Sequence, residues 1–183
     1  MVDNIVYVKS RSVRKVEIMF IGHKENCICI NSKNNYQNTE IKLKKKIFPS
    51  AENFWKRKVV QEPVCHVCKN GLETVFHSLV GCKAAKKIWK ITQFEDDLKG
   101  SVEQDLLSLL LGLNLWRSKA DIELLVTIFW GMWNARNNCL FKGKKESPQL
   151  LVAKAEAMIE AYKRTQLSAL ASIGNQQTVI HKA

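Results

Sequence analysis

Three cysteines and one histidine between positions 65 and 82 have the spacing of a metal site. They are Cys65, Cys68, His77 and Cys82, in the order C-x2-C-x8-H-x4-C. Zn²⁺ prefers four sulfur or nitrogen ligands in a tetrahedron, with sulfur at about 2.3 Å and imidazole nitrogen at about 2.0 Å. Because this ligand set leaves no coordination position open, it favours a structural zinc ion over a catalytic one. The alternative is four ordinary residues, with reduced and partly buried cysteines.

The backbone between His77 and Cys82 is expected to depart from a regular helix. The gap is longer than one helical turn, so a regular helix would turn the two side chains partly apart. We therefore expect a break near Gly81, where the permissive glycine backbone lets both ligands reach one ion. His66 lies inside the Cys65–Cys68 knuckle, and we expect it at the surface rather than on the metal.

Two helical segments are predicted after the knuckle. The first covers residues 75–79 and carries His77, and the second runs from Cys82 to Ile91. The apolar side of the second helix includes Trp89, which should be buried beside the metal. The opposite side carries four lysines at helical spacing: Lys83, Lys86, Lys87 and Lys90.

These four lysines are candidates for a nucleic-acid contact. Their ammonium groups would lie along one helix face, where they could bind phosphates and release counterions. The same stripe could equally be the solvated face of a helix whose other side is core. A second group of candidates precedes the knuckle: Lys56, Arg57 and Lys58.

A further helix is predicted upstream, over Ala51–Lys58, with Ser50 as its N-cap. Trp55 in this helix is expected in the core, as are Trp130 and Trp133, because all three lie at helical spacing among apolar residues. The alternative role for these rings is a platform on which nucleic-acid bases stack.

The first 46 residues differ from the rest of the chain. Asn4–Val8, Val16–Ile21 and Cys27–Ile30 are β-branched or alternating runs, which predict short strands. Asn31–Lys46 is polar and basic, and this composition indicates a linker or a solvated face. A nucleic-acid or nuclear-import patch is the alternative for that stretch.

The second half of the chain predicts helices. Residues 94–100 have the composition of a polar loop, and a capping box at Ser101 begins the next helix. The helix that opens at Ser118 is apolar nearly all round and should lie inside the protein. A last helix begins at Ser147, and residues 168–183 should form a flexible tail. The predicted fold class is mainly α: a small zinc-stapled helical domain followed by a helical bundle, with a short β-rich or irregular N-terminal segment.

The composition favours an intracellular protein with anionic partners. Lys and Arg number 29 against 17 Asp and Glu in 183 residues, so the net charge is +12. Such a balance favours phosphate-bearing partners or anionic surfaces. The start of the chain has no secretory signal, and the longest apolar stretch, 122–133, is too short for a bilayer. We expect the nucleus or the cytoplasm, without secretion and without a membrane partner.

Several segments occur in an order that is typical of one protein family. They are Phe48–Arg57, the C-x2-C knuckle, Glu73–His77, and Cys82 followed by Trp89. Together they resemble the zinc-binding domain of plant non-LTR (LINE-type) retrotransposon reverse transcriptases. The segment Trp130–Asn137 is similar to the tryptophan-arginine-asparagine segment that commonly follows this domain. The resemblance covers roughly residues 47–165.

The resemblance implies the same four zinc ligands and an association with nucleic acid. Residues 1–40 do not look like the usual lead-in of the family, which suggests a truncated or recombined copy. We expect a module without the reverse transcriptase core and the ribonuclease H-like domain that accompany it in the family. The expected domains are 1–46, divergent; 47–95, zinc-binding; 96–167, helical; and 168–183, flexible tail.

We therefore expect a non-catalytic zinc module that binds RNA or DNA and has no small-molecule substrate. A polymerase or nuclease fragment would need several carboxylates that converge on a metal. The sequence offers the pair Asp96-Asp97, which lies in the predicted loop. The remaining alternatives are a protein-interaction module on the same zinc scaffold and a transposon relic without a function.

Overall fold

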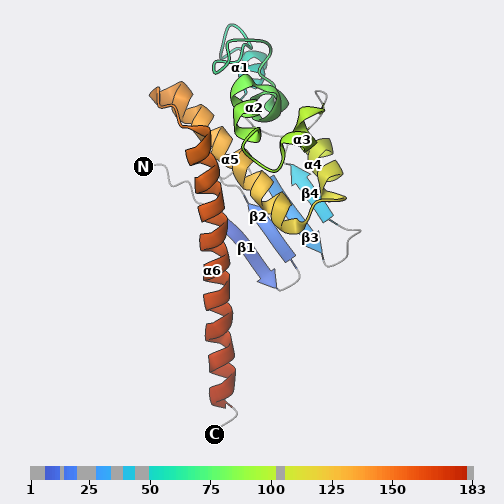
Figure 1. Ribbon diagram of the computed structural model, residues 1–183, viewed down its shortest axis with the longest axis vertical. Coiled ribbons are helices and arrows are strands. Elements are labelled where there is room, and N and C mark those ends of the chain that lie inside the picture. Colours follow the sequence, from blue (N-terminus) through green and yellow to red (C-terminus); the bar gives the residue numbers. More distant parts are fainter. Residues whose placement is uncertain are drawn as a thin grey trace.

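The protein is described here from a computed structural model, which defines residues 7–12, 15–19, 28–33, 39–43, 50–101 and 106–180. Most of these residues lie in helices, as predicted. Figure 1 shows the helices gathered at one end of the molecule, beside an N-terminal sheet, while the last helix extends well beyond the other elements. The predicted capping box at Ser101 and the basic run 44–46 fall wholly or partly outside the described residues.

The N-terminal sheet has four antiparallel strands in the order β1-β2-β3-β4. Three of them overlap the runs that predicted strands. The fourth lies inside the stretch that was expected to be a linker or a solvated face, so the linker interpretation is wrong for Thr39–Leu43. Its Thr39 and Ile41 are β-branched, and Ile41 pairs with Ile30 of the neighbouring strand. Strand pairing thus outweighs the polar composition of this segment. The strands are β1 (Tyr7–Ser12), β2 (Lys15–Met19), β3 (Ile28–Lys33) and β4 (Thr39–Leu43).

The helices follow the predicted order with three differences. The first helix ends two residues early, the predicted loop 94–100 contains a short helix, and the last helix continues past Ser168. Residues 168–173 alternate alanine, serine, leucine and isoleucine without a breaker, which suits a continued helix. The elements are α1 (Ala51–Lys56), the π-helix η1 (His77–Gly81), α2 (Lys83–Trp89), α3 (Glu95–Lys99), α4 (Leu106–Asn114), α5 (Lys119–Lys142) and α6 (Pro148–Ile180).

Helix α5 is the central element of the core, as its apolar sequence predicts. It begins at a capping box between Ser118 and Asp121 and ends at Gly143, which adopts a left-handed conformation with φ 64°. Its buried side chains, from Ile122 to Arg136, belong to the core, and the helix packs against α4, η1 and α6. One continuous cluster joins the knuckle to α6, so the core crosses the expected domain boundary between residues 95 and 96.

Aromatic side chains join the metal-proximal helices to α5. The Trp89 ring packs edge-to-face on Phe129, with centroids 5.3 Å apart, and on Phe94 at 6.5 Å. Phe94 is fully buried. Arg117 closes this side of the core, because its guanidinium bonds to Asp97 at 3.0 Å and lies 5.7 Å from the centre of the Phe94 ring. These contacts hold α3 in place, and such tertiary context can outweigh the polar composition that indicated a loop.

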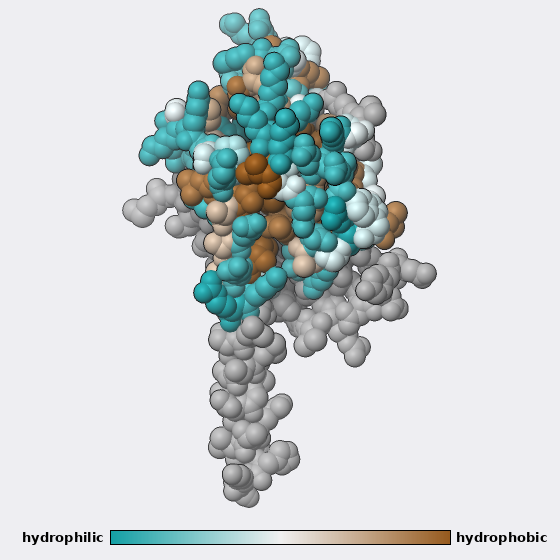
Figure 2. Space-filling view, in the orientation of Figure 1, coloured by the Kyte–Doolittle hydropathy of each residue, from teal (hydrophilic) through white to brown (hydrophobic). Residues whose placement is uncertain are grey.

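The protein surface is mostly hydrophilic in the view of Figure 2, around an apolar strip near the centre of this face. Trp130 and Trp133 pack against the core, as predicted. Trp55 is 48% exposed, so its predicted core position is wrong. Helix α1 is too short to bury more than its first residue, Ala51. None of the helices in the described part of the chain has the length and apolar character needed to cross a bilayer.

Candidate metal centre

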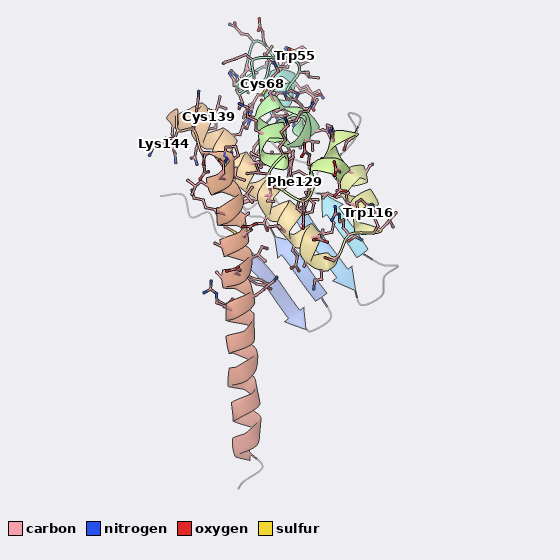
Figure 3. The ribbon with its side chains drawn as sticks, in the orientation of Figure 1. Trp55, Cys68, Trp116, Phe129, Cys139 and Lys144 are labelled. Atoms are coloured by element: carbon pink, nitrogen blue, oxygen red, sulfur yellow. The ribbon has the colours of Figure 1, made fainter. Side chains whose placement is uncertain are left out.

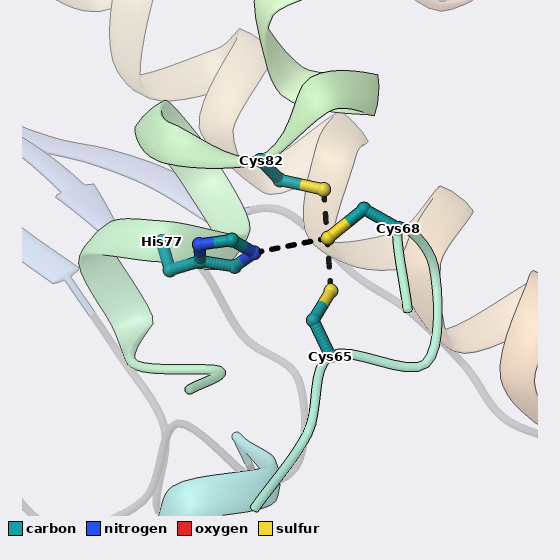
Figure 4. A group of neighbouring side chains, drawn as sticks. All are labelled: Cys65, Cys68, His77 and Cys82. Atoms are coloured by element: carbon teal, nitrogen blue, oxygen red, sulfur yellow. Dashed lines mark hydrogen bonds between the residues drawn. The ribbon is translucent and has the colours of Figure 1, made fainter. Parts of the chain in front are cut away.

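The four predicted ligands converge on one point. Figure 4 shows the side chains of Cys65, Cys68, His77 and Cys82 pointing toward one another. One ligand atom from each of the four lies within 4.8 Å of all the others. The two sulfurs of Cys65 and Cys82 are 4.0 Å apart, and the Cys68 sulfur is 3.4 Å from His77 Nε2. Ligands placed tetrahedrally around zinc would be separated by about 3.6–3.8 Å. The geometry and the donor types therefore suit a structural zinc ion.

The knuckle that carries Cys65 and Cys68 is a tight turn closed by backbone bonds. The Lys69 amide donates to the Cys65 carbonyl at 2.8 Å, and the Cys65 amide donates to the Gly71 carbonyl at 3.1 Å. Lys69 and Gly71 both have a positive φ, 57° and 73°. The left-handed backbone is easy for glycine and strained for lysine. A β-bridge between Val64 and Leu72 closes the base of the turn.

The predicted break between His77 and Cys82 is a π-helix. At its start, the Thr74 hydroxyl accepts a hydrogen bond from the His77 amide at 2.9 Å. The Cys82 amide then donates to the His77 carbonyl at 2.7 Å, five residues back, and Cys82 itself is extended. Gly81 does not use a left-handed conformation. The wider turn, rather than glycine, brings His77 and Cys82 to one ion.

Trp89 satisfies a polar group of this π-helix. Its indole Nε1 donates to the Leu79 carbonyl at 2.8 Å in a buried environment. An unpaired carbonyl at that depth would cost stability, so Trp89 fixes the turn as well as filling the core. This contact confirms the expectation that Trp89 lies buried beside the metal ligands.

The two buried thiols influence each other strongly. The hydrogen bond to Cys82, together with burial, raises the pKa of Cys65 to about 12. The same bond from Cys65 lowers the pKa of Cys82. A divalent cation between them would favour the thiolate form of both, because cysteine binds metal as its anion. Zinc would then neutralise the two thiolate charges, which would be costly to bury without a cation.

A buried ion pair next to the ligands was missed by the sequence reasoning. Arg136 of α5 donates from Nε to Glu73 Oε1 at 2.8 Å and from Nη2 to Oε2 at 2.6 Å. Glu73 is fully buried, and the Arg136 side chain is 7% exposed. Glu73 and Arg136 are 63 positions apart in the sequence. The one sequence signal for this pair was that both residues lie in segments that carry the family resemblance.

The Glu73 carboxylate also organises the residues around the knuckle. Its Oε2 accepts from the Ala51 amide at 2.9 Å, at the start of α1, and its Oε1 lies 3.9 Å from the Cys65 sulfur. The Glu73 carbonyl accepts from the Glu52 amide at 3.2 Å. One side chain thus joins α1, the knuckle and α5.

A hollow of about 230 Å³ lies between the knuckle and the second half of α5. His66 is exposed at its edge, in agreement with the prediction that it is not a ligand. Cys139 also borders the hollow and is a free cysteine outside the four-residue cluster. The lining residues are His66, Val67, Lys69, Arg136, Cys139 and Leu140.

The predicted nucleic-acid contacts are exposed side chains at two helices, α1 and α2. Three lysines of α2 and Lys90, its C-cap, are exposed; together they are called the α2 lysines: Lys83, Lys86, Lys87 and Lys90. At the end of α1, Arg57 and Lys58 are exposed, and Lys56 pairs with Glu52 at 2.6 Å. The structure brings the four metal ligands together, and the two basic groups belong to different helices, α1 and α2.

Comparison with known families supports the metal assignment. Residues 39–89 match the family described as zinc-binding in reverse transcriptase. This range contains all four ligands and ends at Trp89. Comparisons with curated proteins and with solved structures gave no match. This part of the chain is therefore similar to a reverse transcriptase zinc-binding domain and has a site that suits structural zinc.

Proposed function

We propose that the chain is a non-catalytic zinc-binding module, derived from a plant LINE-type retrotransposon reverse transcriptase, that binds RNA or DNA. Helix α2 provides the main contact surface in this proposal. The observation that carries it is the division of α2 into a buried face fixed at the metal site and an outward face of lysines. We place this activity in the nucleus or the cytoplasm.

The buried face of α2 sets the direction in which its lysines point. Ala85, Ile88 and Trp89 are all buried. Cys82, a metal ligand, is the N-cap of the same helix. Because both the metal and the core hold α2, its opposite face is rigid. A fixed row of ammonium groups suits a phosphate backbone, whose charges are regularly spaced.

The absence of catalysis is supported by the role of the acidic pair in α3. Asp97 is bound by Arg117, whose Nη2 lies 2.7 Å from Oδ2. That carboxylate therefore serves to hold α3 against the segment before α5. Catalytic metal sites instead direct several carboxylates at an ion with an open position. The zinc ligands themselves form a closed set of four.

Salt dependence of binding is the direct test. The whole chain, loaded with zinc, is titrated with a fluorescent oligonucleotide at several salt concentrations. Binding through α2 should weaken steeply with salt. In a plot of the logarithm of the binding constant against the logarithm of the salt concentration, the slope should be about −0.7 per phosphate contact for a single strand and about −0.9 for a duplex. Reversing all four α2 lysines to glutamate should abolish binding at physiological salt while zinc content is unchanged.

A matched control keeps the same change in total charge. Four other exposed lysines can be reversed in its place: Lys142, Lys144, Lys145 and Lys163. This control should bind more tightly than the α2 variant. Equal loss in both would mean that net charge, and not α2, accounts for binding. Binding that ignores salt would favour the protein-interaction alternative, and no binding by the unmodified protein would refute the proposal.

A further inference from the structure

The end of α1 presents an aromatic ring to solvent that the core does not use. Trp55 is 48% exposed, whereas Trp89 is 3% exposed. Val59 and Leu72 are also exposed, at 65% and 46%. Single exposed apolar side chains are ordinary on protein surfaces, so the significance of Trp55 depends on the residues beside it. Figure 3 shows Trp55 toward the same end of the molecule as Cys68, away from Trp116.

The backbone that carries Trp55 is held firmly at its start. The Ser50 hydroxyl accepts from the Asn53 amide at 3.3 Å, and Ser50 is fully buried. The Ala51 and Glu52 amides both donate to Glu73. Since Glu73 is itself held by Arg136, α1 is anchored to the core of the protein. An indole on such a support is pre-organised for binding and loses little freedom when a ligand covers it.

Two cations, Arg57 and Lys58, lie close after Trp55 in the sequence. Lys56 is occupied by Glu52, but Arg57 and Lys58 form no ion pair within the part of the chain that the structure describes. Lys58 has a φ of 60°, a backbone conformation that usually takes glycine. The run from Trp55 to Val59 is exposed throughout. It therefore combines one flat ring with two free positive charges.

We propose that this surface, formed by Trp55, Arg57 and Lys58, binds single-stranded nucleic acid by stacking one base on the indole. The inference rests on the proposed nucleic-acid function and specifies its substrate. In a duplex each base face is already covered by its neighbours, whereas a single strand can place a base on an exposed ring. The two cations then contact the phosphates beside that base.

The test compares Trp55→Ala and Trp55→Phe with the unmodified, zinc-loaded chain. The probes are a single-stranded oligonucleotide and a duplex of equal length, at fixed salt. Stacking contributes about 1–3 kcal/mol per base, so Trp55→Ala should weaken single-strand binding roughly 5- to 150-fold. Duplex binding should change less than twofold. Trp55→Phe should keep most of the affinity but lose the quenching of Trp55 fluorescence.

Trp116→Ala is the matched control, because Trp116 is 60% exposed and also lies beside an arginine, Arg117. It should bind both probes as the unmodified chain does. If Trp55→Ala binds single strands normally while the α2 lysine variant does not, the stacking inference is overturned and the proposed function stands. If the unmodified chain binds neither probe, the proposed function fails and the stacking inference fails with it.

Discussion

Arg136 holds both carboxylate oxygens of Glu73 across 63 positions of sequence, at 2.6 and 2.8 Å. The pair lies beside the Cys65 sulfur and away from solvent. Burying two charges carries a large desolvation cost, so the bond stabilises the protein only while both partners are present. This relationship makes the zinc site and helix α5 parts of one structure.

Replacing one partner of this pair should be costly. We expect Arg136→Met to lower the free energy of unfolding by about 3–5 kcal/mol, because Glu73 would remain buried without a counter-charge. The double variant Glu73→Gln with Arg136→Met should be more stable than Arg136→Met alone. Urea unfolding in the presence of zinc measures both values. A double variant as unstable as the sum of the two single changes would show that the residues act independently.

Metal binding should depend on the four clustered residues and not on cysteine in general. Purified protein should contain one zinc per chain, and Cys82→Ser should lose it. Cys139→Ser is the control, since Cys139 lies outside the ligand cluster. Structural zinc contributes on the order of 10–16 kcal/mol to small domains, so a chelator should unfold residues around the knuckle. Metal content by mass spectrometry and circular dichroism would check this. A chain that keeps its fold and lacks zinc would contradict it.

Zinc affinity should rise with pH. Because the pKa of Cys65 is raised to about 12, its thiol carries a proton throughout the range from pH 6 to pH 9. Zinc must displace that proton, so each proton released changes the apparent affinity about tenfold per pH unit. Lowering the pH therefore weakens binding. Calorimetry in buffers of different ionisation enthalpy should detect at least one released proton at pH 8; none would contradict this assignment.

The indole N–H of Trp89 should contribute to the stability of the protein in addition to the volume of the ring. Trp89→Phe keeps an aromatic ring but leaves the buried Leu79 carbonyl without its donor. We expect a loss of about 1–3 kcal/mol in the free energy of unfolding. Trp130→Phe is a suitable comparison, because Trp130 is only partly buried, and should cost less. The two variants can be ranked by urea denaturation; equal losses would assign the effect to ring volume alone.

The metal ligands and most helices could be predicted from local patterns. The C-x2-C-x8-H-x4-C spacing specified the ligands, and capping residues such as Ser50 and Ser118 specified helix starts. The break before Cys82 followed from the spacing of two ligands, although the pattern could not specify a π-helix. These features depend on residues close together in the sequence.

The features that could not be predicted depend on distant partners. Helix α3 and strand β4 have polar compositions, and they form because Arg117 and β3 lie beside them. Trp55 was expected in the core because it lies at helical spacing among apolar residues. Helix α1 has only six residues, however, and only its first residue, Ala51, is buried. The Glu73–Arg136 pair joins positions that no local window contains.

The contacts of Trp89 and Glu73 with α5 also determine which fragments of the protein can be expressed with an intact core. A fragment cut to the family match, residues 39–89, would keep every zinc ligand but leave out Phe129 and Arg136. Such a fragment would expose an indole that normally packs in the interior and a carboxylate that normally has a counterion. The shortest piece worth expressing begins before Ser50 and extends through the part of α6 that packs on α5.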